Sequence, residues 1–409
     1  MKYLFGLVAA LICTSVSYGQ STHIIQNQYK FKYLTIDEGL SNNHVGSVCQ
    51  DEKGFIWFAT QNGVDRYDGQ SIVNYRHSPD DSTTISGNDV NVIFSDSRGN
   101  LWTGNNGGLD LYNSEMDNFI RFHHSKLDSA IGNVEDIDED SEGILWIAAS
   151  TGLYAYNHST NELEIFRNEP GKINVLPDNT MFRLMVDNDD NVWISIINKG
   201  ICIYDQDKEK FECFSNDPLD STSISGNRIE RFYQDNAGNI WIGTLNNGLN
   251  MFNPLNKTFT RIMPDPENNY AGRVRAIFED KKGNFFVGTR IGLYMKNGNE
   301  FIPYANTDHN FSTLSQNSLL CSYIDRTGTL WLGTFAGGVN YTNLLRKEFI
   351  NYRAGAYDNH FLSSPNVYSI TEDRSGDLWI GTDNGLNYLD RVTNTFTYFF
   401  RDETDPNSI

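Results

Sequence analysis

The stretch Asp235-Asn236-Ala237-Gly238-Asn239-Ile240-Trp241 decides the fold, because its pattern returns along the whole chain. All seven tryptophans of the protein occupy the position of Trp241, and Phe286 occupies it once. Neighbouring members of this row lie 44 to 48 residues apart: Trp57, Trp102, Trp146, Trp193, Trp241, Phe286, Trp331 and Trp379. The chain is therefore built from eight copies of one unit, and a repeat of this length is typical of propellers and solenoids.

An aspartate stands six residues before each aromatic residue of the row. A glycine follows the aspartate after three residues, except in the fourth copy, where Asp190 takes that place. An Asp-x-x-Gly segment favours a tight turn, because the carboxylate accepts hydrogen bonds from backbone amides and glycine adopts positive φ. We interpret the aspartates as turn caps and predict no metal site. They are Asp51, Asp96, Asp140, Asp187, Asp235, Asp280, Asp325 and Asp373.

Each copy has room for four short strands. In the second copy we predict strands at 90–95, 101–104, 109–112 and 119–122, with a tight turn at 96–99 and a hairpin closed by glycines near 107. Four short strands repeated with this period are the signature of a propeller blade, and the aromatic row is expected to pack against the next blade. The sequence thus predicts an all-β fold, a β-propeller of four-stranded blades.

The two ends of the chain bear on the number of blades. Residues 29–35 look like a fourth strand without a blade of its own, so we expect them to supply the outer strand that closes the ring. Residues 402–409 match the segments at 80–85 and 217–224, which precede a new blade. The N-terminal strand could close a ring of seven or of eight blades.

Composition limits the setting and the partners of the protein. Lys2, the apolar run at 4–13 and the small residues before Gln20 predict a signal peptide at 1–19 and an exported protein. A formal net charge of -20 argues against a nucleic-acid partner, because phosphate contacts need clustered lysine and arginine. The cysteines that remain after signal removal are too few for a disulfide scaffold in a chain of 409 residues.

One pair of cysteines has an informative spacing. Cys202 and Cys213 are eleven residues apart, as are Asp110 and Arg121 in the equivalent strands of another copy. If such residues are cross-strand partners, the two thiols lie opposite one another and within bridging distance in an oxidising compartment. Two free, half-buried thiols are the alternative.

The repeat resembles that of the two-component regulator propeller family. The resemblance rests on Gly39-Leu40-Ser41-Asn42-Asn43, on Asp51, Gly54 and Trp57, and on Gly63-Val64-Asp65-Arg66-Tyr67. It extends over residues 29–409. The resemblance implies the periplasmic sensor region of a hybrid two-component histidine kinase from bacteria that use complex polysaccharides. It also implies two successive seven-bladed propellers, a membrane helix and kinase modules, of which the last two are not in this sequence.

On this resemblance we favour a seven-bladed ring at 29–354, with the eighth repeat at 355–409 as the first blade of a second propeller. An eight-bladed ring is the alternative. We expect a periplasmic, ligand-sensing protein that recognises an oligosaccharide, uses no cofactor and is itself no enzyme. It would reach the membrane only through a C-terminal region beyond this sequence, and a homodimer of the full-length form stays open.

Other functions of a propeller remain alternatives. The sequence contains no nucleophile elbow, zinc-protease motif or phosphate-binding loop, and we predict no catalytic residue. A polysaccharide-acting glycosidase or lyase is nevertheless one alternative, and a protein-binding propeller is another.

The candidate binding residues lie at one end of the blades. In a propeller the loops from second to third strand, and from fourth strand to the next first strand, share one face, which we call the loop face. The Asp-x-x-Gly turns share the opposite face, the turn face. At the starts of the first strands the residue type varies between copies, so specificity can reside there. The candidate ligand-binding residues are His44, Asp89, Arg228, Arg231, Arg273 and Arg275.

The four arginines form a basic cluster in an acidic protein. Guanidinium groups match the geometry of carboxylates and sulfates, so the cluster predicts a site for a carboxylated or sulfated oligosaccharide. The alternative is that these arginines pair with Glu135, Asp136 and Glu230 inside the protein.

Overall fold

The structure is a computed structural model that describes residues 29–127, 131–169, 171, 175–304, 314–345, 352–355 and 359–409. The predicted signal peptide at 1–19 lies outside the described residues. The chain divides into two compact units, Met1–Leu345 and Arg346–Ile409. Each unit is described by itself below.

The described regular structure consists of strands and two short 3-10 helices, η1 (Ile36–Glu38) and η2 (Asn269–Gly272). The first strands of the sheets are β2 (Val45–Gln50), β6 (Val90–Ser95), β10 (Val134–Glu139), β14 (Met181–Val186), β18 (Ile229–Gln234), β22 (Val274–Glu279), β26 (Leu319–Ile324) and β29 (Val367–Glu372). The second strands are β3 (Ile56–Thr60), β7 (Leu101–Asn105), β11 (Ile144–Ala149), β15 (Val192–Ile196), β19 (Ile240–Thr244), β23 (Phe285–Thr289), β27 (Thr329–Thr334) and β30 (Leu378–Thr382).

The third strands are β4 (Gly63–Tyr67), β8 (Gly108–Asn113), β12 (Gly152–Asn157), β16 (Gly200–Asp205), β20 (Leu249–Asn253), β24 (Leu293–Asn297), β28 (Val339–Asn343) and β31 (Gly385–Asp390). The outer strands are β5 (Ile72–Tyr75), β9 (Asn118–Arg121), β13 (Glu162–Phe166), β17 (Lys210–Phe214), β21 (Thr258–Ile262), β25 (Glu300–Pro303), β1 (Lys32–Leu34) and β32 (Thr395–Phe399). The four strands predicted for the second copy are confirmed to within one residue at each end.

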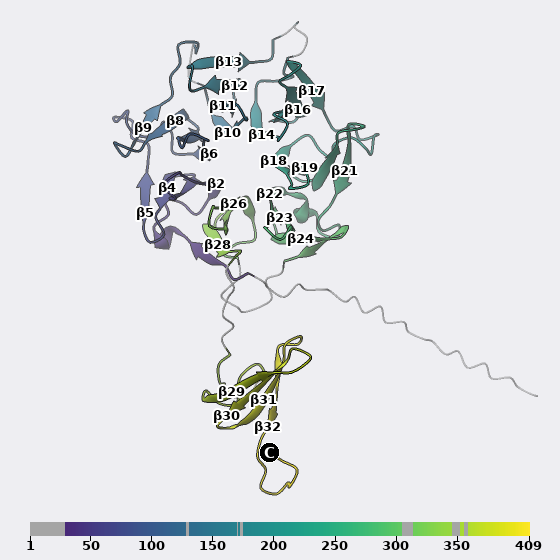
Figure 1. The fold of residues 1–409 in the computed structure, drawn as a ribbon. Coiled ribbons are helices and arrows are strands. Elements are labelled where there is room, and N and C mark those ends of the chain that lie inside the picture. Colours follow the sequence, from purple (N-terminus) through teal and green to yellow (C-terminus); the bar gives the residue numbers. More distant parts are fainter. Residues whose placement is uncertain are drawn as a thin grey trace, which may run out of the picture. The chain divides into compact units, whose positions relative to one another are not determined.

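In the first unit the described residues form seven antiparallel four-stranded sheets arranged in a ring (Figure 1). The first strand of each sheet lies innermost and contacts the first strands of both neighbouring sheets, including β2 with β26. We number these sheets as blades 1 to 7, beginning with the blade of β2 and ending with that of β26. The predicted all-β propeller fold is confirmed.

The N-terminal strand completes blade 7. Strand β1 pairs antiparallel with β28, with Lys32 opposite Tyr341 and Leu34 opposite Val339. Residues 32–34 therefore join the blade of Trp331, an arrangement that is consistent with the expected seven-bladed ring. The run at 349–352, which by its sequence would close the seventh copy, falls mostly outside the described residues.

The repeated aspartate and tryptophan hold each blade together. In blade 2, Asp96 Oδ1 accepts hydrogen bonds from the amides of Arg98 and Asn100 in the turn, while Asp96 Oδ2 accepts one from the indole nitrogen of Trp102 at 3.0 Å. The same indole–carboxylate bond, 2.7 to 3.1 Å long, is present in all seven copies that contain tryptophan. Each aspartate thus caps its turn and also fixes the tryptophan six residues later.

The tryptophans of the ring pack against the following blade, as the repeat predicts. Trp57 is fully buried, and its ring lies 4.8 Å from that of Tyr112 on the third strand of blade 2. Trp193 meets Phe252 of blade 5 in the same way, at 5.1 Å. These edge-to-face contacts join neighbouring sheets that would otherwise expose an apolar face.

Blade 6 lacks the indole, and a residue from the N-terminus replaces its hydrogen bond. Phe286 cannot donate to Asp280, but the hydroxyl of Tyr29 donates to Asp280 Oδ2 at 2.9 Å. The ring of Tyr29 also contacts the ring of Phe286 edge to face. The segment that leads into β1 therefore supplies the donor that this copy does not have.

The second unit contains one four-stranded sheet, β29 to β32. Its core is small and consists of Leu362, Ile380, Leu389 and Phe396, with a few partly buried neighbours. Every residue of β29 is exposed within the described residues, in contrast to the first strands of the ring.

Candidate functional site

A β-bulge near the start of every first strand shapes the channel at the centre of the ring. In blade 5 the pairing of β18 with β19 shifts between Ile229 and Arg231, so Glu230 is the extra residue, and β22 carries the same shift around Arg275. In blade 4, Phe182 and Arg183 both lie between the paired residues Met181 and Leu184. A bulge changes the direction in which side chains point. The bulge residues of the blades lie at the same depth in the channel, and their residue type differs from blade to blade.

Four charged residues at or next to these bulges, Glu135, Arg183, Glu230 and Arg275, form what we call the charged ring. Arg183 Nε donates to the carbonyl oxygen of Glu230 at 3.1 Å, and its Nη1 donates to the carbonyl oxygen of Glu135 at 3.3 Å. Arg275 Nε donates to Glu230 Oε2 at 2.7 Å. Successive blades 3 to 6 thus alternate in charge and are joined by these contacts.

Glu230 brings three of the predicted binding residues together. Its side chain is fully buried, and besides the bond from Arg275 it has Arg228 Nε and Arg273 Nη2 each 3.9 Å from Oε1. A distance of 3.9 Å is too long for a hydrogen bond. Among the described residues, Glu230 Oε1 and Arg273 Nε have no hydrogen-bond partner. All three arginines therefore form ion pairs with Glu230, as the alternative of internal pairing predicts, but only Arg275 hydrogen-bonds to it, so Arg228 and Arg273 keep donors for another group.

His44 and Asp89 lie on blades 1 and 2 at the loop-face mouth of the channel. The His44 ring contacts Phe335 edge to face at 5.4 Å. Burial lowers the pKa of His44, the charge of Arg275 lowers it further, and Asp89 opposes both. Among the described residues, no hydrogen bond or ion pair joins His44 or Asp89 to the arginines, although the charge of Arg275 acts on His44. They belong to the same mouth, but not to the cluster around Glu230.

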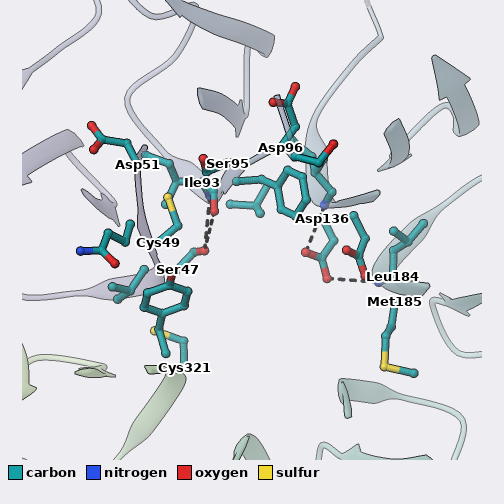
Figure 2. A pocket seen from close by; sticks show the side chains of 18 of the residues that line it. Ser47, Cys49, Asp51, Ile93, Ser95, Asp96, Asp136, Leu184, Met185 and Cys321 are labelled. Atoms are coloured by element: carbon teal, nitrogen blue, oxygen red, sulfur yellow. Dashed lines mark hydrogen bonds between the residues drawn. The ribbon is translucent and has the colours of Figure 1, made fainter. Parts of the chain in front are cut away.

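Arg231 lies deeper, among the residues that line a cavity of about 490 Å³ inside the channel. Figure 2 shows part of the lining of this cavity. The cavity is lined by residues from the first strands of six blades, starting just past the bulges, and Ser47, Asp136 and Cys321 are among them. From there it extends to the turns at Asp51 and Asp96. The cavity thus reaches the turn face. None of the side chains of the charged ring lines it. The structure therefore divides the four predicted arginines between two levels of the channel.

Two carboxylates in this cavity join blade 3 to blade 4. Asp136 Oδ2 accepts a hydrogen bond from the amide of Leu184 at 3.1 Å, and Asp138 Oδ2 accepts one from Val186 at 2.8 Å (Figure 2 shows the contact of Asp136). Burial raises the pKa of Asp138 to about 7, although these amide bonds oppose the shift. Burial also raises the pKa of Asp136, against the charge of Arg183.

The carboxyl of Glu135 in the charged ring shows the same behaviour. Burial raises the pKa of Glu135 to about 7, with the charge of Arg183 opposing and that of Asp136 reinforcing the shift. Glu135 and Asp138, whose pKa values are both raised to about 7, are therefore partly protonated at neutral pH and carry less negative charge than the sequence suggests.

Two exposed aromatic residues at the loop face were missed by reasoning from sequence. Tyr270 in the loop before β22 is 60% exposed, and the guanidinium of Arg290 lies 5.0 Å from its ring centre. Phe335, in the loop between β27 and β28, is 54% exposed and contacts His44. The sequence did contain a signal for both, since each is an aromatic residue in an otherwise polar loop.

The paired cysteines lie on the outer hairpin of blade 4. Cys202 of β16 is directly opposite Cys213 of β17, with their Cα atoms 4.0 Å apart, and the two form a disulfide. Cys49 and Cys321 are free and buried.

Neither a metal centre nor a membrane-spanning helix is evident in the described part of the chain. There, no group of three or more histidine, cysteine, aspartate and glutamate side chains is placed to hold a metal ion. No helix among the described residues has the length and apolar character needed to cross a bilayer.

Comparisons with known proteins agree with this geometry. A family described as "Two component regulator propeller" matches at residues 39–62, 223–246 and 362–384. Histidine kinase P4 of Formosa agariphila is 38% identical over 60 residues, which are 15% of this chain and 4% of that protein. The extracellular domain assigned to a hybrid two component system of B. thetaiotaomicron superposes with a TM-score of 0.68 at 23% identity, covering 92% of this chain and 55% of that chain.

An enzyme also shares the architecture. Virginiamycin B lyase from Staphylococcus aureus superposes with a TM-score of 0.57 at 14% identity, over 78% of this chain and all of the lyase. At these identities the solved structures establish the fold alone. The chain spans about half the length of the B. thetaiotaomicron domain and a small part of the kinase.

The ring of sheets and the repeated Asp–Trp unit define a β-propeller. The residues that differ from blade to blade lie around its central channel. Three repeats of the chain match the model of the two-component regulator propeller, and the chain is similar in fold to extracellular domains of two-component systems.

Proposed function

We propose that this chain is the periplasmic sensing region of a two-component signal-transduction regulator, and that its loop face recognises an acidic oligosaccharide. The family match and the similarity to extracellular domains of two-component systems support the sensory part of the proposal. Signalling would require kinase modules and a membrane anchor from beyond residue 409, and dimerisation of that longer protein fits such a mechanism.

The observation that carries the proposal is the excess of arginine over carboxylate at Glu230. Three guanidinium groups lie around this one buried side chain, and only Arg275 hydrogen-bonds to it. Arg228 is 48% exposed and Arg273 is 30% exposed at the loop-face mouth. Their planar forks are suited to a carboxylate or sulfate, which such groups bind through paired hydrogen bonds.

The exposed aromatic residues complete a surface suited to sugars. Tyr270 and Phe335 belong to blades 6 and 7, and the arginines belong to blades 5 and 6. A sugar ring has an apolar face that packs on an aromatic side chain, while its acidic substituents need cationic donors. This arrangement favours an oligosaccharide over a single small anion at the loop face.

Calorimetric titration of the full chain tests this proposal. The probes are oligogalacturonate and a sulfated glycosaminoglycan fragment at constant ionic strength, each compared with a neutral oligosaccharide of equal length. We expect one acidic probe to bind, and Arg228→Gln and Arg273→Gln each to weaken binding by about tenfold, which corresponds to 1.4 kcal/mol. Arg374→Gln, which removes an exposed arginine from the Asp-x-x-Gly turn of the eighth repeat, serves as the matched control.

The same samples distinguish a sensor from an enzyme. Chromatography of the probe after prolonged incubation should return it intact. Shortened or unsaturated products would identify a glycosidase or lyase instead. Acidic glycans that bind the arginine variants as tightly as the parent protein would exclude the loop face as the site.

A further inference from the structure

We propose that the channel cavity is a second binding site, in which Arg231 holds a small oxyanion such as a sugar acid, phosphate or sulfate. This site goes beyond the proposed recognition of an oligosaccharide at the loop face. It lies on the other side of the charged ring and reaches the opposite face of the propeller.

The state of Arg231 is the first step of the argument. Its side chain lines the cavity, and its Nε atom is buried without a hydrogen-bond partner among the described residues. Across the same residues it forms no ion pair. The residue as a whole is partly exposed, and its charge acts on Asp136 and Asp138, so the unpaired donor is Nε alone. A buried donor without an acceptor is unfavourable, and such donors normally have partners. An oxyanion offers paired acceptors that match the guanidinium fork.

The other arginines near the cavity already have roles. Arg326 donates to Gln50 Oε1 at 3.0 Å and also to the carbonyl oxygen of Asp51, which fastens blade 7 to the turn of blade 1. Arg183 is held by the carbonyl oxygens of Glu135 and Glu230. Arg98 is exposed at the turn-face end, where it adds positive charge on the path into the cavity.

The acidic groups of the cavity do not prevent an anion from binding. Asp136 and Asp138 each accept an amide hydrogen bond from blade 4, so their oxygens are engaged in the wall of the channel. Burial raises the pKa of Asp138 to about 7, which reduces its negative charge at neutral pH, and it also raises the pKa of Asp136; the charge of Arg231 opposes both shifts. A protonated carboxyl group can also donate a hydrogen bond to a ligand. In turn, the hydroxyl groups of a sugar acid can donate hydrogen bonds to carboxyl oxygens that carry no proton.

The size and position of the cavity define the ligand class and its route. A volume of about 490 Å³ lies within the usual range of small-molecule pockets and accommodates a monosaccharide acid with a few waters. The lining of the cavity includes the Asp-x-x-Gly turns of blades 1 and 2 and none of the side chains of the charged ring. A ligand would therefore enter from the turn face.

Calorimetric titration of the full chain with glucuronate, phosphate and sulfate tests the site. Sodium chloride at matched ionic strength is the blank. We expect at least one oxyanion to bind with 1:1 stoichiometry, and Arg231→Gln to weaken that binding at least about tenfold, since a charge-assisted hydrogen bond contributes about 1.5–3 kcal/mol. Arg231→Lys should bind with intermediate affinity, because it keeps the charge and loses the fork. Arg374→Gln, which removes an exposed arginine that belongs to neither site, should bind as the parent protein does.

Several outcomes separate the sources of the oxyanion and the two sites. Preference for glucuronate assigns a sugar acid, whereas equal or tighter binding of phosphate or sulfate assigns an inorganic ion. Oxyanion binding that survives in Arg228→Gln and Arg273→Gln shows that this site does not depend on the loop face. If Arg231→Gln does not fold by circular dichroism, Arg231→Lys and a selenate-soaked crystal of the parent protein carry the test. No binding to the parent protein, equal binding to a folded Arg231→Gln, or selenium density away from Arg231 would overturn the proposal.

Discussion

At the scale of single residues, blade 6 shows how the repeat tolerates the loss of its tryptophan. We expect Tyr29→Phe to lower the free energy of unfolding by about 1–2 kcal/mol, because it removes a buried hydrogen bond to a carboxylate without removing the ring. Chemical denaturation followed by fluorescence measures this change. Tyr33→Phe is the control, since Tyr33 is exposed on the same segment and should change stability by less than about 0.5 kcal/mol. Equal effects of the two substitutions would show that the hydroxyl of Tyr29 contributes nothing specific.

The buried carboxyl of Asp138 should make stability depend on pH. Its pKa is raised from 3.8 to about 7 by burial, so between about pH 4 and pH 7 the folded state keeps a proton that the unfolded state releases. This contribution to stability is therefore complete in acid, falls as the pH rises through this window, and stays constant above it. Asp138→Asn keeps an acceptor for the amide of Val186 and cannot ionise. We expect it to flatten the decline of Tm between pH 4 and 8 and to raise Tm at pH 8 by about 2 °C or more.

Asp89→Asn, which removes an exposed carboxylate at the loop face, controls for the change in net charge. A pH profile of Tm that is the same in Asp138→Asn and in the parent protein would contradict the assignment.

At the scale of secondary-structure elements, corresponding positions in β2 and β29 differ in their surroundings. Val48 and Ile370 each stand three residues before the turn aspartate of their copy, yet Val48 is 7% exposed and Ile370 is 62% exposed. We expect Val48→Ser to cost about 2–3 kcal/mol through lost apolar burial and a buried hydroxyl. Ile370→Ser should cost less than about 0.5 kcal/mol and should reduce the binding of a hydrophobic dye. Hydrogen exchange of β2 and β29 reports the two sites separately, and equal costs would mean that β29 is covered in solution.

The strands were predictable because the repeat presents the same evidence eight times. The spacing of Asp96 and Trp102 locates one turn and one strand, and the other copies confirm the register. The hydrogen bond between these two residues was not predicted, although their constant separation of six residues pointed to it. The bond from Tyr29 to Asp280 could not be predicted, because nothing local links residues so far apart in the sequence.

The binding residues were predicted less completely, because the bulge changes the direction of successive side chains. Arg231 and Arg275 look alike in sequence, but Arg275 is the extra residue of its bulge and Arg231 follows one. They consequently occupy different levels of the channel. Aligning the copies places Glu230 and Arg275 at the same repeat position, and that comparison could have predicted their ion pair. The burial of Glu230 depends on the whole ring and has no local signal.

At the scale of the whole molecule, closure of the ring depends on three residues. We expect a chain that begins at Thr35, and so lacks β1, to have a lower Tm and faster hydrogen exchange in β26 to β28, because β28 loses its outer neighbour and Val339 loses contact with Leu34. A chain that begins at Gln28 keeps Tyr29 and β1 and is the control. Unchanged exchange in blade 7 of the shorter chain would show that the closing strand is dispensable.

The closing strand also has a consequence for synthesis of the protein. Leu34 leaves the ribosome long before Val339, its partner, and at about 5–20 residues per second the interval is on the order of 15–60 s. During that time β1 is an unpaired segment among blades that are already complete. Its length of three residues and the lysine it contains make it a poor template for pairing with another chain. The shortness of the closing strand therefore protects the nascent protein from pairing with other chains until β28 has been synthesised.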